Sequence, residues 1–255
     1  MYLMTKRNKR RKLAENNGFN RADPSKILSA DSSFQVKEAY NSIRTNLMFI
    51  QQGEKCPVFV ITSPTANNGK TINTINLAIS FAQMGKKTLV IDSDMRNPTM
   101  HRMFYIPVKN GLSEILAGLT DSISVSKTPI ENLSVLTAGK IPPNPAELLS
   151  SSRMDKLLSF VKDHYDCVFI DTPPINIVTD STLFAQKVTG YVLIIKTDTT
   201  NINDVKTTVA TLDQIDANVL GFIINDVSSD KKKYYSYYRR YNYNYNYDYN
   251  YNYKY

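Results

Sequence analysis

Six short apolar segments recur along this chain of 255 residues, and they constrain its fold more than any other feature. Each is about five residues long and rich in Val, Ile, Leu and Phe, which is typical of strands buried on both faces. The segments are residues 57–63, 88–92, 133–139, 166–171, 191–196 and 219–225. Because helix-length stretches separate most of them, the pattern predicts an α/β fold with a mostly parallel sheet and helices on both faces.

Helical periodicity supports this fold class. Residues 32–52 begin with two serines that can cap a helix and then place apolar side chains at helical spacing. Further helices are expected from 71 to Gly85, across 151–163, near 179–187 and near 202–215. In parallel sheets of this kind ligands bind at the carboxyl ends of the strands, so the polar residues that follow the strands indicate function.

The first strand leads into Ser-Pro-Thr-Ala-Asn-Asn-Gly-Lys-Thr, residues 63–71, and then into a helix. This matches the Gly-Lys-Thr end of a phosphate-binding P-loop in its proper strand–loop–helix context, although Pro64 replaces the first Gly of the general pattern. Backbone N–H groups at the helix start would cradle an anion, Lys70 would meet the β- and γ-phosphates, and Thr71 would ligate Mg²⁺. The expected nucleotide-binding residues are Ala66, Asn67, Asn68, Gly69, Lys70 and Thr71.

Carboxylates end two of the other strands. Asp92 closes the segment at 88–92 and Asp94 follows two residues later, whereas Asp171 closes the segment at 166–171. Helix capping would explain Asp94 or Asp180 singly, but it does not explain three carboxylates at strand ends beside a P-loop. Such carboxylates are positioned for hydrated Mg²⁺, so we expect one nucleoside triphosphate site with its metal held by Thr71, Asp92 and Asp171.

The C-terminal 22 residues contain 12 of the 17 tyrosines, and from Tyr241 onward every second residue is Tyr. Strict alternation is compatible with an edge strand, but such a strand would be about three times the usual length. Alternating polar and aromatic residues also mark disordered, association-prone tails. A third interpretation, that the phenols are substrates, requires an enzyme.

Charge and composition exclude several classes of protein. The two ends of the chain carry more positive charge than the net charge of +8, so the middle is mildly acidic and a nucleic-acid groove on the fold is not expected. Cys56 and Cys167 lack metal-ligand spacing and are expected to be core residues of a protein in a reducing compartment. No apolar run approaches the length of a membrane-spanning helix. These features predict a cytoplasmic protein.

The residues at 63–71, Leu-Val-Ile-Asp-Ser-Asp-Met-Arg-Asn-Pro at 89–98 and Phe-Ile-Asp-Thr-Pro-Pro at 169–174 resemble the Walker A, A′ and B motifs of bacterial protein-tyrosine kinases, the BY-kinases of capsule and exopolysaccharide assembly. The segment Lys-Glu-Ala-Tyr-Asn-Ser-Ile-Arg-Thr-Asn-Leu-Met-Phe, 37–49, resembles that family's oligomerisation helix. Glu38 and Arg44 keep the outer positions of its Glu-x-x-Arg-x-x-Arg pattern, whereas Asn41 replaces the central Arg. The tyrosine-rich tail is a hallmark of the family, and the resemblance covers about residues 34–255.

The resemblance implies a stand-alone kinase that uses ATP and Mg²⁺, with Lys70, Asp92, Asp94 and Asp171 as catalytic residues. The basic residues at 6–12 and the polar stretch at 13–31 predict a separate N-terminal segment at 1–31. The resemblance implies a P-loop kinase domain at 32–228 and an autophosphorylation tail at 229–255. It also implies homo-oligomers formed through Glu38, Arg44 and the tail, a membrane adaptor that recruits the kinase to the inner face of the plasma membrane, and a cognate phosphotyrosine phosphatase. The expected phosphorylation sites are Tyr234, Tyr235, Tyr237, Tyr238, Tyr241, Tyr243, Tyr245, Tyr247, Tyr249, Tyr251, Tyr253 and Tyr255.

Two other functions compete with this one. A partitioning or division-site ATPase of the same P-loop branch would carry a signature Lys four residues before the last Gly of the loop, where this chain has Thr65, and would lack the tail. A nucleotide-binding adaptor without kinase activity would not need Lys70, Thr71 and the three carboxylates together. The tail and the intact motifs therefore favour the kinase.

Overall fold

The computed structural model describes residues 23–51 and 53–227. The chain divides into two units, Met1–Asn225 and Asp226–Tyr255. Nearly all described residues belong to the first unit. The tail tyrosines and the basic residues at 6–12 lie outside the described residues, so the phosphorylation expected of the tail stays a prediction.

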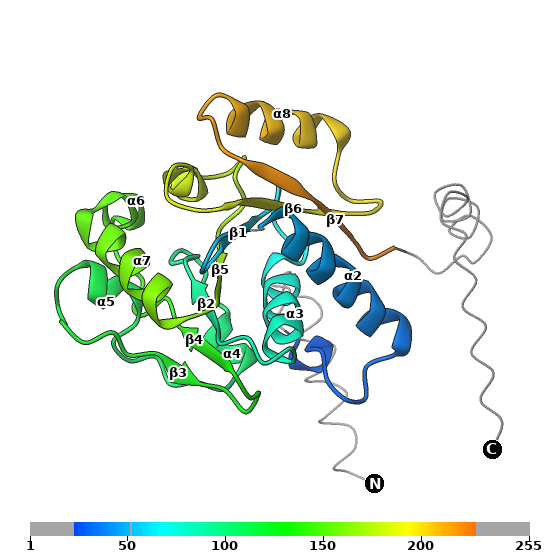
Figure 1. The fold of residues 1–255 in the computed structure, drawn as a ribbon. Coiled ribbons are helices and arrows are strands. Elements are labelled where there is room, and N and C mark those ends of the chain that lie inside the picture. The colour runs from blue at the N-terminus through cyan, green and yellow to red at the C-terminus, as the bar shows by residue number, and fades with distance from the viewer. Residues whose placement is uncertain (1–22, 52, 228–255) are drawn as a thin grey trace, which may run out of the picture. The chain divides into compact units, whose positions relative to one another are not determined.

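The described residues form a seven-stranded sheet in the order β3-β4-β2-β5-β1-β6-β7 (Figure 1). Every neighbouring pair is parallel except β3 and β4, which are antiparallel. The strands are β1 Val58–Thr62, β2 Thr88–Asp92, β3 Ser126–Lys127, β4 Leu133–Leu136, β5 Cys167–Asp171, β6 Gly190–Lys196 and β7 Val219–Asn225. All six predicted strands are present, and the two-residue β3 at the sheet edge is the one that the apolar pattern missed.

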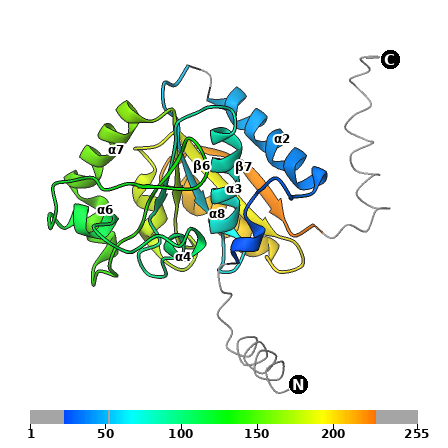
Figure 2. The same ribbon diagram turned by 90° about the horizontal axis from the view of Figure 1, so that it is seen from below.

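Helices cover both faces of this sheet. The helices are η1 Pro24–Lys26, α2 Phe34–Ile50, α3 Lys70–Ala82, α4 Met100–Met103, α5 Leu112–Leu116, α6 Pro145–Ser150, α7 Ser152–His164, η2 Thr179–Phe184 and α8 Ile202–Asp213. Figures 1 and 2 show α2 and α3 on one side of the sheet and α6 and α7 on the other. The predicted α/β class with helices on both faces is thus confirmed.

Two differences from the expected elements have local causes. The helix expected near 179–187 is η2, a short 3-10 helix, and the Ser181 carbonyl in it accepts a hydrogen bond from the buried Tyr191 hydroxyl at 2.7 Å. Residues 23–31, which the sequence assigns to the N-terminal segment, include η1 and the buried Leu28, whose backbone N–H donates to Asn76 of α3 at 2.8 Å. The described end of that segment is therefore packed against α3.

Strand side chains alternate between two apolar cores, one on each face of the sheet. Val58 and Val60 of β1 enter the core beneath α5–α8, whereas Phe59 and Ile61 enter the core beneath α2–α4. In the second core the Phe169 ring lies 5.3 Å from the rings of both Phe59 and Phe81. This double burial explains why the strands are almost continuously apolar.

We expect Phe169→Ala to lower the free energy of unfolding by about 3–5 kcal/mol, because it removes a fully buried ring and leaves a cavity between two others. Urea denaturation measures the change. Phe34→Ala is the control, since Phe34 is 74% exposed at the start of α2 and its loss should cost about 0.5 kcal/mol or less. Equal effects of the two substitutions would contradict the assignment of this core.

Candidate functional site

The predicted P-loop joins β1 to α3, and Gly69 caps the helix with a left-handed backbone at φ 88°. A Cβ at Gly69 would lie 2.4 Å from Nδ2 of Asn225, the last residue of β7. Glycine is therefore required here both by conformation and by space. The same Asn225 amide donates to the Asn68 carbonyl at 2.9 Å, so the end of β7 supports the loop from outside.

Of the other predicted nucleotide-binding residues, Ala66 and Asn67 are exposed at the tip of the loop, and Asn68 is buried. Lys70 and Thr71 form the first turn of α3, a helix of 13 residues. The N-terminal end of such a helix carries partial positive charge and unpaired N–H groups, which together bind anions. The loop thus has the geometry that phosphate binding needs.

Lys70 is 9% exposed, and this burial lowers the pKa of its ammonium group, while the nearby Asp171 and Asp94 oppose that shift. A buried cation at the start of a helix, close to two carboxylates, stays charged only if anions surround it. Lys70 is therefore placed to bind a phosphate in addition to its acidic neighbours.

Asp92 and Asp171 lie side by side, because they are paired in register at the ends of β2 and β5. Oδ2 of Asp92 accepts the backbone N–H groups of Thr99 and Met100, each at 3.1 Å, whereas Oδ1 is buried without a partner. Burial, followed by repulsion from Asp171, raises the pKa of Asp92 well above its usual range. This unpartnered oxygen is an open acceptor in a site already rich in negative charge.

Asp171 is held by two hydroxyls from the first turns of α3. Thr71 donates to Oδ2 at 2.6 Å and Thr74 to Oδ1 at 3.2 Å. Burial raises the pKa of Asp171 to about 7, although Lys70 and Thr71 act in the opposite direction. The predicted metal-site residues Thr71, Asp92 and Asp171 are thus brought together as expected.

These three residues fit a magnesium ion. The described residues contain no cluster of three or more His, Cys, Asp and Glu side chains that could hold a metal by themselves. Mg²⁺ requires only one or two carboxylates, because phosphates and water supply its remaining ligands. The hydroxyl of Thr71, the carboxyl of Asp171 and the unpartnered Oδ1 of Asp92 provide oxygen ligands of the required kind.

Asp94 lies two residues beyond β2 and is less buried than Asp92. Its Oδ1 accepts the Asn97 N–H at 3.0 Å, and burial raises the pKa of its carboxyl while Lys70 lowers it. Arg96 in the same loop makes a bidentate ion pair with the buried Asp180, at 2.8 and 2.9 Å. This pair fastens the loop after β2 to η2 and so fixes the backbone around Asp94.

The sequence did not indicate the partners that hold these groups. Asn225 at the end of β7, Asp180 in η2 and Asn73 in α3 support the loops that carry the predicted residues. Asn225 follows an apolar strand, as Asp92 and Asp171 do, so the same positional signal could have found it. Asp180 was considered only as a possible helix cap, and it is instead the acceptor of Arg96.

The predicted oligomerisation residues lie on α2, outside this cluster. Glu38 is exposed and accepts a hydrogen bond from Asn41, one turn later, at 2.9 Å. Arg44 is half-buried and donates to the Ser80 carbonyl of α3 at 2.7 Å. Arg44 therefore holds α2 on its own fold, whereas Glu38 faces solvent.

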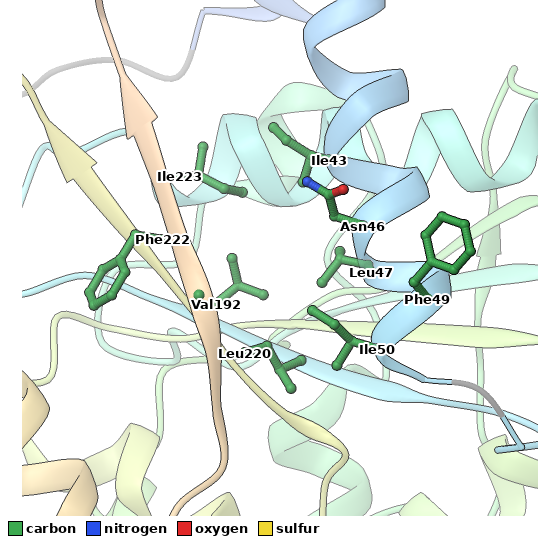
Figure 3. Close-up of a pocket in the computed structure, with 10 residues that line it drawn as sticks. Ile43, Asn46, Leu47, Phe49, Ile50, Val192, Leu220, Phe222 and Ile223 are labelled. Atoms are coloured by element: carbon green, nitrogen blue, oxygen red, sulfur yellow. The ribbon is translucent and has the colours of Figure 1, made fainter. Parts of the chain in front are cut away.

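An apolar groove of about 440 Å³ lies between α2 and the edge strand β7. Figure 3 shows Leu47 and Ile50 of α2 opposite Val192 and Leu220. The groove is lined by the second half of α2 and not by the P-loop. No helix among the described residues is both long enough and apolar enough to cross a bilayer.

The fold and the loop define a P-loop nucleotide-binding domain, and the family model described as AAA domain matches residues 60–225. The putative tyrosine-protein kinase CapB of Staphylococcus aureus is 41% identical over 204 residues, which are 80% of this chain and 90% of that protein. The tyrosine-protein kinase CpsD of Streptococcus pneumoniae is 36% identical and covers 81% of this chain and 92% of its own length. The chain therefore belongs to the bacterial tyrosine-protein kinases.

Solved structures agree with this assignment. The kinase domain of Escherichia coli tyrosine kinase ETK superposes with a TM-score of 0.75 at 30% identity and covers 94% of this chain and 91% of that domain. The septum site-determining protein MinD from Pyrococcus horikoshii has a TM-score of 0.58 at 21% identity, which shows a shared fold alone. The predicted kinase class is confirmed, and the division-site ATPase alternative is not favoured.

Two glycine substitutions distinguish the steric effect of a side chain beside the P-loop from the effect of backbone strain. Gly69→Ala and Gly85→Ala both place a side chain at positive φ, a strain of about 1–2 kcal/mol, but a Cβ at Gly85 meets nothing within 4 Å. We expect both to lower stability similarly from strain, and only Gly69→Ala to weaken nucleotide binding, since it displaces Asn225 and the loop. Calorimetric titration with MgADP checks this. Equal nucleotide affinities of the two variants would contradict it.

Proposed function

We propose that this chain is an ATP- and Mg²⁺-dependent protein-tyrosine kinase that phosphorylates its own C-terminal tyrosine cluster and regulates capsular or exopolysaccharide synthesis and export. One observation carries the proposal. A P-loop with Lys70 and Thr71 meets the buried Asp92 and Asp171 at the carboxyl ends of the strands, in a chain that ends in 12 closely spaced tyrosines. We assign the kinase domain to 32–228 and the substrate tail to 229–255.

In this proposal the loop from Ala66 to Thr71 wraps the phosphates of ATP. The N–H groups at the start of α3 bind their oxygens, and the Lys70 ammonium neutralises the β- and γ-phosphates. The buried position of Lys70 supports this role, because a charge in low dielectric interacts more strongly with the negative charge that develops during transfer.

Thr71, Asp92 and Asp171 would hold Mg²⁺, whose positive charge would offset the negative charge of the phosphates. The hydrogen bond from Thr71 to Asp171 keeps these two side chains together. The backbone N–H groups of Thr99 and Met100 orient Asp92 so that Oδ1 stays available.

The chemical step is an in-line transfer to a tyrosine phenol. A bond forms between the phenol oxygen and the γ-phosphorus, the bond from that phosphorus to the β–γ bridging oxygen breaks, and ADP leaves. A free phenol has a pKa of about 10, so its proton must pass to a base. Asp92 and Asp94 are the two candidates, and Asp94 suits this role better because it is the more accessible of the two.

Assembly would bring tails to active sites. We propose homo-oligomers that use Glu38, Arg44 and the tail, a membrane adaptor that recruits the kinase to the inner face of the plasma membrane, and a cognate phosphatase that resets the tail. Phe34, Phe49 and Ile50 on α2 are 74%, 66% and 49% exposed, which supports an interface on this helix. Exposed apolar side chains gathered on one element are typical of interaction sites.

We expect Lys70→Met and Asp92→Ala to lower autophosphorylation by several orders of magnitude while they leave the fold intact. Phosphoryl transfer depends on positioning and charge stabilisation, and each substitution removes one charge from the site. Incorporation of labelled phosphate into tyrosine measures the effect, with circular dichroism as the check on folding. Lys86→Met is the matched control, because Lys86 is exposed in the segment after α3, away from the P-loop end of that helix. Near-normal labelling of either site variant would refute the assignment.

We also expect the tail to be phosphorylated in trans. A subunit contact through α2 would hold a tail near the next active site at roughly millimolar effective concentration. The test mixes full-length Lys70→Met protein with an active kinase that lacks residues 231–255, and an Asp92→Ala version of the truncated kinase serves as the blank. The Lys70→Met chain should be labelled when it is mixed with the active truncated kinase and should stay unlabelled when it is mixed with the Asp92→Ala version. An unlabelled Lys70→Met chain would exclude transfer in trans.

A further inference from the structure

A continuous set of hydrogen bonds links the segment before α2 to the P-loop. Asn76 of α3 accepts the Leu28 N–H through Oδ1 and donates through Nδ2 to the Lys26 carbonyl at 3.1 Å. The same Nδ2 donates to the Tyr40 hydroxyl oxygen at 3.1 Å, and that hydroxyl donates to Oδ1 of Asn73 at 3.0 Å. Nδ2 of Asn73 then donates to the Gly69 carbonyl at 2.8 Å. Three elements, η1, α2 and α3, thus contribute to one chain of contacts that ends at the loop.

This chain of hydrogen bonds has a fixed direction. The backbone N–H of Leu28 can only donate, so it holds the oxygen of the Asn76 amide, and the amide nitrogen must face Lys26 and Tyr40. The Tyr40 oxygen therefore accepts from Asn76, and its own proton goes to Asn73. Each amide is held in one of its two orientations by the group before it.

Burial keeps these hydrogen bonds intact. Asn73 and Asn76 are each 2% exposed, so water is not available as a substitute partner. Burial also raises the pKa of the Tyr40 phenol, which keeps the hydroxyl a neutral donor. A buried amide that loses its partner is left with an unsatisfied polar group, and without the Tyr40 hydroxyl the amide of Asn73 loses the contact at its oxygen that sets its orientation.

The last hydrogen bond of this network sets the direction of a backbone N–H group that would bind phosphate. In a planar trans peptide the C=O and the following N–H point in opposite directions. The Gly69 carbonyl is held by two groups of Asn73, its side chain and its backbone N–H, at 2.8 and 3.0 Å. The N–H of Lys70 is consequently aimed away from Asn73 and toward the N-terminal side of α3, where an anion would bind.

We propose that Tyr40 is a positioning residue for nucleotide binding, which acts through Asn73 and the Gly69–Lys70 peptide and so couples the packing of α2 to the P-loop. The proposal rests on the proposed function in that the loop must bind nucleotide. It extends that function, because the helix expected to contact neighbouring subunits then also sets the affinity of the active site. By linkage, bound nucleotide tightens the packing of α2 by the same factor.

The test is the binding of MgADP to full-length Tyr40→Phe protein, measured by titration calorimetry at a temperature where all variants are folded. The substitution keeps the ring and removes only the hydroxyl. We expect an affinity about three- to tenfold weaker than that of the unmodified chain, the usual size of one lost hydrogen bond. Tyr191→Phe is the matched control, since it removes a buried hydroxyl that donates to Ser181 in the opposite core. Its MgADP affinity should not change.

A double-substitution cycle tests the route. If Tyr40 acts through Asn73, Tyr40→Phe should weaken MgADP binding in the unmodified chain but have no further effect in an Asn73→Ala background. Additive effects would overturn the route through Asn73. Unchanged affinity of Tyr40→Phe, or an equal loss in Tyr191→Phe, would overturn the proposal while leaving the kinase function standing. Failure of the unmodified chain to bind MgADP would instead overturn the proposed function, and this inference with it.

Discussion

The burial of two carboxyl groups side by side is the constraint on which the rest of this structure depends. Asp92 and Asp171 are 0% and 1% exposed, and the register of β2 against β5 places them next to each other. Such a pair is unfavourable in low dielectric unless hydrogen bonds and positive charge surround it. Backbone N–H groups of Thr99 and Met100 and hydroxyls of Thr71 and Thr74 supply the hydrogen bonds. Lys70 supplies part of the charge, and the proposed Mg²⁺ would supply the rest.

Helix α3 supplies many of these contacts, and for that reason its first turns contain residues of low helix propensity. Asn and Thr are poor helix formers compared with Ala and Leu, yet α3 buries Asn73, Thr74 and Asn76 within its first seven residues. Each of these side chains has a partner outside its own turn: Asp171, Tyr40 or the segment at 26–28. Local helix propensity is therefore lower where the helix serves the site, while other residues of α3, such as Ile75, Leu77 and Phe81, fill the core. This local conflict is typical of functional sites.

The sheet and the loop were predictable because their signals are local. Apolar runs of about five residues, Gly-Lys-Thr after the first of them and Asp at the ends of two others fix the fold class and bring Lys70, Thr71, Asp92 and Asp171 together. The supporting contacts were not predictable in this way. Tyr40 meets Asn73, 33 positions later, and Arg96 meets Asp180, 84 positions later, only after helices have packed on the sheet. A single sequence contains no signal for such pairs.

In the proposed assembly helix α2 would both pack on its own fold and contact a neighbouring subunit, and different side chains are available for each. Tyr40, Arg44 and Leu47 face the fold, where Arg44 donates to Ser80 and Leu47 is buried. Glu38 and Phe49 face solvent. Because Arg44 already has a partner on α3, a neighbouring subunit would have to share or displace that contact, and the replacement of the central Arg by Asn41 removes one further cation from the helix. An interface on α2 would consequently depend more on the exposed apolar side chains than on ion pairs. A subunit contact on that surface would act on the packing of α2 against α3, the helix that begins at the P-loop. Assembly and nucleotide binding would then be coupled through the contacts between these two helices rather than by a separate regulatory element.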